Sequence, residues 1–173
     1  MNGNITEQKM GSSDDDHISL HALCEEDFPW LLLWMTKETS SSLSLLLQTS
    51  GSSTEIIIIT GIINNHERVS LLTLYAAAFT RLKANYILQP DEYSVQQFQL
   101  NPLLFNKPRT LLSLLNLYIS WIFTTIKAKK ILWEIHKLDQ SNQELALKAG
   151  FRLSGSQGDK LFTLYECAGQ PGN

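Results

Sequence analysis

The sequence predicts a single α/β domain with a mixed, mostly antiparallel central sheet and flanking helices. The segment from Ile131 to Gly155 reads as a strand, a short capped helix and a second strand. An Asn64-Asn65 pair between two strand-like runs is typical of a hairpin turn, which makes that strand pair antiparallel. The length of 173 residues suits one hydrophobic core and is short for two domains.

The N-terminal part predicts one strand followed by two short helices. Ile18 to Leu23 alternates in character and forms the first strand. Pro29 suits the first turn of a helix that runs to about Thr36. A serine cluster can then cap a second helix, Leu43 to Gln48. The apolar surface of the first helix comes from Leu31, Leu32, Trp34 and Met35.

Three strands are expected in the middle of the chain. Glu55 to Ile59 is rich in β-branched residues and predicts a buried strand. Val69 to Phe79 follows the predicted hairpin turn and forms its second strand. Tyr93 to Leu100 is the third, and Asn101-Pro102 ends it because proline cannot donate a hydrogen bond to a sheet.

The most apolar stretch predicts a helix over Arg109 to Lys127. Its content of Leu, Ile, Trp and Phe is compatible with a membrane span. Polar residues nevertheless recur every three or four positions, so one side of the helix is polar. We therefore expect a helix that packs on the sheet. The polar stripe consists of Ser113, Asn116, Ser120, Thr124 and Lys127.

The C-terminal part begins with the strand Ile131 to His136. Asp139 or Ser141 can cap the next helix, whose Leu145 and Ala149 share one face. Gly150 ends that helix in the left-handed conformation, and Phe151 starts a strand. A last strand, Lys160 to Glu166, follows a turn at Gly155 to Gly158.

Composition excludes several kinds of protein. The net charge of −3 gives no basic field for nucleic acid or an anionic membrane. Cys24 and Cys167 lie far apart without a metal-ligand pattern, so we expect reduced thiols, no metal and a cytoplasmic location. Residues 1–16 are expected to be a flexible leader, 17–168 the domain and 169–173 a flexible tail, and the apolar surface could support a homodimer.

The segment that contains the capped helix and Gly150-Phe151 resembles the GNAT acetyltransferase superfamily. Members often read Asn-x-x-(Ser/Ala)-x-x-x-(Tyr/Ala)-x-x-x-Gly-Phe, and here Asp139, Asn142 and Ala146 stand at the first three defined positions. The order of helices and strands also matches that superfamily. The alternative is another α/β protein in which Gly-Phe reflects turn chemistry alone.

The resemblance implies a site for acetyl-CoA or a related acyl-CoA. In the superfamily the acyl-CoA lies against a splayed central strand, and its pyrophosphate lies at the N-terminus of the long helix. The loop before that helix lacks the usual glycines, while Lys107 and Arg109 either contact phosphates or are solvated charges. Asn101 to Leu104, with Asn106 and Thr110, also resembles the loop of UDP-amino-sugar N-acetyltransferases. The implied cofactor-binding residues are Phe98, Gln99, Leu100, Phe105, Asn106, Lys107, Arg109, Thr110, Asp139 and Asn142.

Acyl transfer to an amine needs a proton acceptor, and three residues are candidates. Glu92 precedes the central strand, whereas Glu134 and His136 share one face of the next strand. An unperturbed imidazole, with a pKa of about 6.5, is the better match to neutral pH. The alternative for Glu134 and His136 is a polar strand face with local hydrogen bonds. The superfamily's usual acid, a tyrosine, is replaced by Ala146, so an acid comes from elsewhere or from water.

The central strand carries an unusual number of polar residues for a buried position. Gln96, Gln97 and Gln99 predict either a cavity or a solvated face, and Gln96 and Gln97, being adjacent, are expected on opposite sides. The sequence thus predicts an acyl-CoA-dependent N-acyltransferase acting on a primary amine of a small molecule, such as an amino-sugar nucleotide. The alternative is a catalytically degenerate binding or interaction module with the same fold, and CoA binding distinguishes the two.

Overall fold

The computed structural model describes residues 18–23, 27, 29, 56–63, 67–101, 108–154 and 160–169. The predicted leader, the two helices after the first strand and the Asn64-Asn65 turn lie outside this range, apart from single positions.

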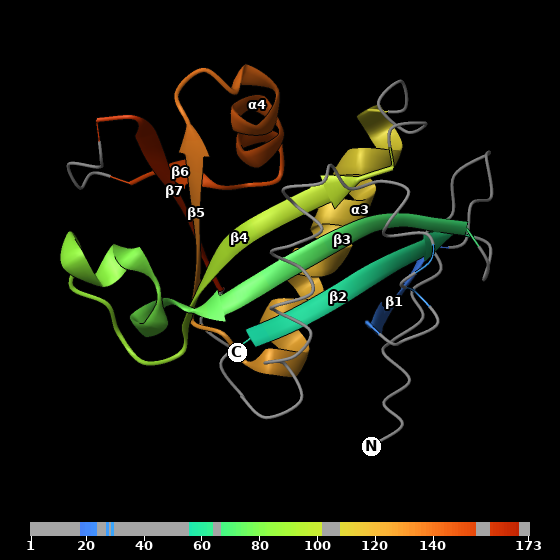
Figure 1. Ribbon diagram of the computed structural model, residues 1–173, viewed down its shortest axis with the longest axis horizontal. Helices are drawn as coiled ribbons and strands as arrows, with labels where there is room; N and C mark the ends of the chain where they lie inside the picture. Colours follow the sequence, from blue (N-terminus) through green and yellow to red (C-terminus); the bar gives the residue numbers. More distant parts are fainter. Residues whose placement is uncertain are drawn as a thin grey trace.

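A seven-stranded sheet forms the centre of the molecule, in the order β1-β2-β3-β4-β5-β7-β6 (Figure 1). Every neighbouring pair is antiparallel except β4 and β5, which run parallel. The predicted mixed, mostly antiparallel sheet is therefore confirmed. The strands are β1 (Ile18–Ala22), β2 (Ile56–Ile63), β3 (Glu67–Ala76), β4 (Glu92–Leu100), β5 (Lys130–His136), β6 (Arg152–Leu153) and β7 (Phe162–Ala168).

Two helices cover one face of this sheet. The α3 helix (Pro108–Trp121), which continues as a π-helical turn over Ile122–Ile126, shares a core with β2 to β5, and α4 (Gln140–Lys148) joins the same core through Ala146. On the opposite face, a smaller apolar cluster joins Leu132 and Leu164 to the 3₁₀ turns η2 (Ala77–Phe79) and η3 (Arg81–Ala84). Alternate residues of β5 thus pack on opposite faces of the sheet.

Gly61 lets α3 lie close to β2. A Cβ atom at this position would stand 2.5 Å from Ser70 Oγ and 2.7 Å from Leu114 Cδ1, which is too close for unmoved neighbours. The fully buried Tyr118 hydroxyl lies 2.8 Å from Ser70 Oγ and donates to the Ile59 carbonyl at 3.3 Å. Burial raises the pKa of the Tyr118 phenol well above its usual range. These contacts fix α3, and therefore its N-terminus, relative to the sheet.

The predicted elements occur with shifted ends. The strand predicted to end at Ile59 continues to Ile63 through Gly61, and the strand predicted over Val69 to Phe79 ends at Ala76 because η2 begins there. The last strand lies two residues later than expected. Asp139 caps α4 as predicted, and Gly150 has a φ of 90°. Among the described helices, none is long and apolar enough to cross a membrane.

Candidate active site

The two parallel strands separate halfway along their length. β4 and β5 pair only from Glu92 opposite Lys130 to Val95 opposite Trp133. Beyond that point β4 stays paired with β3 as far as Leu100, and β5 stays paired with β7 as far as His136. Figure 1 shows the two strands diverging. Past Val95 and Trp133, the backbone groups of β4 and β5 that face one another therefore form no hydrogen bonds between the two strands. We call this region the open end of the β4/β5 pair.

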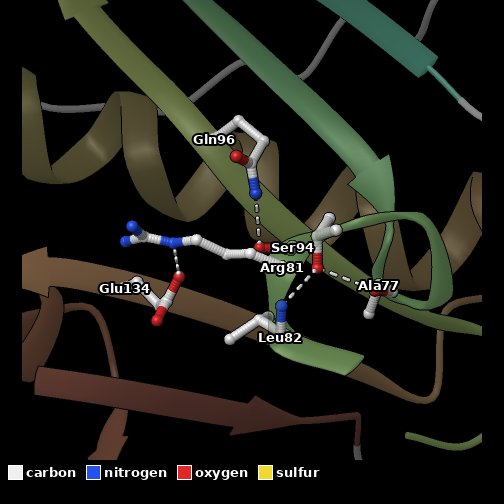
Figure 2. A network of polar contacts seen from close by, with 7 residues as sticks. Ala77, Arg81, Leu82, Ser94, Gln96 and Glu134 are labelled. Atoms are coloured by element: carbon white, nitrogen blue, oxygen red, sulfur yellow. Dashed lines mark hydrogen bonds and ion pairs between the residues drawn. The ribbon is translucent and has the colours of Figure 1, made fainter. Parts of the chain in front are cut away.

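A β-bulge marks the start of the open end. Thr73 pairs with Gln97 and Leu74 pairs with Val95, so Gln96 is an extra residue on β4. The expectation that Gln96 and Gln97 point to opposite sides by strict alternation is wrong, because the bulge interrupts the alternation. Gln96 donates through Nε2 to Ser94 Oγ at 3.0 Å, on the face opposite α3 (Figure 2). A bulge also increases local twist, which suits a strand that leaves its neighbour.

Aromatic side chains line the open end on the α3 face. The Phe98 ring meets Tyr118 and Trp133 edge to face, with centroid distances of 6.1 Å and 6.0 Å. Trp133 in turn contacts Phe151, the residue after the Gly150 turn, at 5.8 Å. The predicted residues Phe98 and Leu100 both pack against this core.

Two buried polar atoms on the other face have no partner within the described part of the chain. Gln99 Oε1 and Thr73 Oγ1 are buried and accept no hydrogen bond from the described residues, and Thr73 pairs with Gln97 in the neighbouring strand. Buried polar atoms are usually satisfied, so unpaired acceptors here suit a site that takes water or a ligand.

The N-terminus of α3 lies just after the end of β4. Within the described residues, Asn101 follows β4 and α3 begins at Pro108, with Arg109 exposed and Thr110 half-buried. The first turn of a helix offers unpaired N–H groups and a positive dipole end. The other predicted loop residues, Phe105, Asn106 and Lys107, lie outside the described range.

Glu92 lies at the closed, paired end of β4 and β5, away from the other two candidate bases. Its carboxylate is buried, accepts the Gln89 backbone N–H at 3.0 Å and lies 3.2 Å from Lys130 Nζ. Lys130 also approaches Glu166 at 3.7 Å. The structure therefore gives Glu92 a set of local partners and does not bring it to the open end.

Glu134 and His136 do lie at the open end. Glu134 is the first β5 residue past the last pair with β4, and its carboxylate accepts from Arg81 Nε at 2.8 Å (Figure 2). His136 accepts the Leu138 backbone N–H through Nδ1 at 3.2 Å. That bond assigns the neutral imidazole proton to Nε2, which makes the exposed side of the ring a hydrogen-bond donor.

Two predicted cofactor residues bind each other at the start of α4. Asp139 accepts the Asn142 backbone N–H at 3.1 Å and the Asn142 amide at 2.7 Å. Both side chains therefore hold the first turn of the helix. Ala146 is fully buried, and the nearby Tyr165 hydroxyl donates to Gln143 at 3.1 Å.

Sequence reasoning missed Arg81. It lies in η3, between two strands that sequence patterns identify, and its Cζ lies 4.1 Å from the Phe162 ring centroid. Nothing in its immediate sequence indicates a site, because its partners Glu134 and Phe162 are far away along the chain.

Solved structures with the same fold include N-acetyltransferases and a protein of unknown function. A protein of unknown function from Bacillus halodurans matches with a TM-score of 0.75 and 16% identity, covering 96% of this chain and 92% of its own. Spermidine N-acetyltransferase from Vibrio cholerae, solved with CoA and spermine, matches with a TM-score of 0.67 and 15% identity. The match covers 87% of this chain and 95% of that protein. The Campylobacter jejuni N-acetyltransferase PseH, solved with acetyl coenzyme A, matches with a TM-score of 0.67 and 11% identity. The match covers 88% of this chain and 99% of that protein.

The chain has the GNAT fold. At these identities the likeness establishes the fold alone, and neither a family model nor a curated protein matches the sequence. Within the described part of the chain, no group of His, Cys, Asp or Glu gathers as a metal site.

Proposed function

We propose that this protein is an acyl-CoA-dependent N-acyltransferase that transfers an acetyl group to a primary amine of a small molecule. The observation that carries the proposal is the separation of β4 from β5 after Val95 and Trp133. Closing two parallel strands over their full length would satisfy more backbone groups, so the open end has a cost that a function explains.

The residues at the open end fit an acyl-CoA. Unpaired β4 backbone near Phe98 to Leu100 can hydrogen-bond an extended amide chain as a strand would. The aromatic surface of Phe98 and Trp133 suits the apolar parts of that chain. Arg109 and the first N–H groups of α3 suit a pyrophosphate. When bound, acetyl-CoA would supply the acyl group as a thioester.

The chain's own groups can serve the transfer chemistry. As the C–N bond forms and the C–S bond breaks, the amine loses a proton and the leaving sulfur gains one. A β4 backbone N–H near Phe98 to Leu100 would polarise the carbonyl. We assign the proton-accepting role to Glu134, through water, because His136 Nδ1 already accepts the Leu138 N–H. His136 Nε2–H is a donor at the same place.

The first experiment is calorimetric titration of acetyl-CoA into the wild type, Arg109→Ala and Lys148→Ala. Lys148 is the matched control, since it is an exposed cation on α4 whose ion-pair partner among the described residues is the exposed Glu144. We expect about tenfold weaker binding for Arg109→Ala, the effect of one charge-assisted phosphate contact, and no change for the control. Absence of binding by the wild type at millimolar acetyl-CoA would overturn the proposal.

A binding module without transfer activity is the second candidate. The buried Ala146 favours it, because the hydroxyl that many superfamily members place there is missing. Such a module would show no acetylated product with any amine. Screening of primary amines, beginning with amino-sugar nucleotides because of the resemblance at Asn101 to Thr110, separates the two candidates.

A further inference from the structure

The turn that carries Arg81 is rigidly held. Thr80 Oγ1 donates to the Ala77 carbonyl at 2.7 Å and accepts the Leu82 N–H at 3.3 Å. Ala77 and Leu82 are fully buried against Leu132 and Leu164. These contacts fix the point at which the Arg81 side chain leaves the backbone (Figure 2).

Two further contacts fix the guanidinium itself. Arg81 Nε donates to Glu134 Oε2 at 2.8 Å, and Cζ lies 4.1 Å from the centroid of the Phe162 ring. The side chain is nevertheless 54% exposed. Only Nε is used in the contacts that the described residues make with it, so the terminal Nη groups remain available for hydrogen bonds. A held guanidinium loses little conformational freedom on binding a ligand.

The guanidinium lies beside the open end, on the face opposite α3. Trp133 packs in the α3 core, so its neighbour Glu134 points to the other face. Figure 2 shows the Arg81 side chain extending between Ser94 and Gln96 of β4 and Glu134 of β5. A neutral amide, a neutral hydroxyl and a cation thus border the place where the strands separate. The Glu134 carboxylate already accepts from Arg81.

We propose that Arg81 binds an anionic group, a carboxylate or a phosphate, on the amine acceptor. This inference rests on the proposed transferase function and adds the chemical class of the acceptor. The planar Nη edge matches the two oxygens of such a group, and it does not suit the cationic chain of a polyamine. Arg81 is therefore a specificity-determining residue for the second substrate.

The test compares Arg81→Gln and Arg81→Lys with the control Lys83→Gln, an exposed residue of the same turn. Ethanolamine, phosphoethanolamine and β-alanine serve as acceptors, so that neutral, phosphate and carboxylate amines are compared. We expect the wild type to prefer one anionic amine over ethanolamine by about tenfold in kcat/KM, the effect of one charge-assisted pair. Arg81→Gln should abolish that preference, measured as the ratio of kcat/KM between the anionic amine and ethanolamine, because a loss that acts through the Arg81–Glu134 contact is common to all three acceptors and cancels in the ratio. The control should behave as the wild type does.

Equal loss for all three acceptors in Arg81→Gln would overturn the proposal, as would a wild type without preference. A second measurement does not depend on transfer. The Arg81 Nε–H resonance of ¹⁵N-labelled protein is followed as inorganic phosphate or acetate is added, and Arg81→Lys identifies the signal. We expect a saturable shift with the oxyanion that is preferred in the kinetic assay.

The two proposals fail separately. If acetyl-CoA binds but neither oxyanion moves the Arg81 resonance, the acceptor inference is wrong and the transferase proposal stands. If an oxyanion moves the resonance while acetyl-CoA does not bind, Arg81 is an anion site and the transferase proposal is wrong.

Discussion

The two ends of the β4/β5 pair hold similar charges in different surroundings. At the closed end, Glu92 is buried between paired strands and bonds Lys130 and the Gln89 N–H. At the open end, Glu134 bonds Arg81, whose guanidinium lies half exposed on Phe162. Both are carboxylate–cation pairs, one between β4 and β5 and the other between β5 and the η3 turn.

The difference shows that strand pairing, more than residue type, decides what a charged pair can do. Glu92 and Lys130 lie in register across the sheet, where their contacts stabilise the pairing. Glu134 and Arg81 lie where the β4 and β5 backbones no longer satisfy each other, so solvent or a ligand must complete the hydrogen bonds. We therefore assign stability to the closed end and chemistry to the open end.

The largest expected effect is on turnover in Glu134→Gln. The new amide oxygen can still accept from Arg81 Nε, so the guanidinium stays in place while the basic carboxylate is lost. Loss of a general base typically lowers the rate by about 10²–10⁴-fold, and we expect kcat to fall by about 1,000-fold. Single-turnover rates at saturating acetyl-CoA measure this loss.

His136→Asn is the control for that measurement, since asparagine can still accept the Leu138 N–H. We expect at most about a tenfold loss in kcat, the effect of one lost hydrogen-bond donor. If kcat falls about 1,000-fold in His136→Asn and less than about tenfold in Glu134→Gln, His136 is the base.

Deletion of Gln96 should give the next largest effect. Without this extra residue, Val95 and Gln97 would pair with Leu74 and Thr73 in regular alternation, so each side chain would keep its face. We expect a melting temperature close to that of the wild type and a loss of about 100-fold in kcat/KM, because the strand would no longer be bent at the open end. Retained activity would show that the bulge does not shape the site.

The comparison between the closed and open ends of the β4/β5 pair also shows what sequence patterns can predict. Periodicity and capping predicted β4, β5 and α4, and Gly150-Phe151 indicated the fold, because these depend on neighbours along the chain. The bulge at Gln96 depends on the register between two strands and was not predicted. Arg81 meets Glu134 across 53 residues of sequence, a contact that no local pattern encodes. Glu92 and Glu134 therefore looked equivalent as candidate bases until strand pairing separated them.

The smallest effect on function is expected at the closed end, in Glu92→Ala. Removing this buried carboxylate leaves the Gln89 N–H without its acceptor and Lys130 with the more distant Glu166, which should cost about 2 kcal/mol of unfolding free energy. For a chain of this size that corresponds to a decrease of roughly 4–8 °C in the melting temperature. Glu144→Ala, which breaks an exposed pair with Lys148, is the control and should change the unfolding free energy by less than about 0.5 kcal/mol.

We expect kcat/KM of folded Glu92→Ala to stay within about twofold of the wild type, because Glu92 acts on stability alone. A large loss of turnover without a loss of stability would return Glu92 to the list of candidate bases and break the division between the two ends.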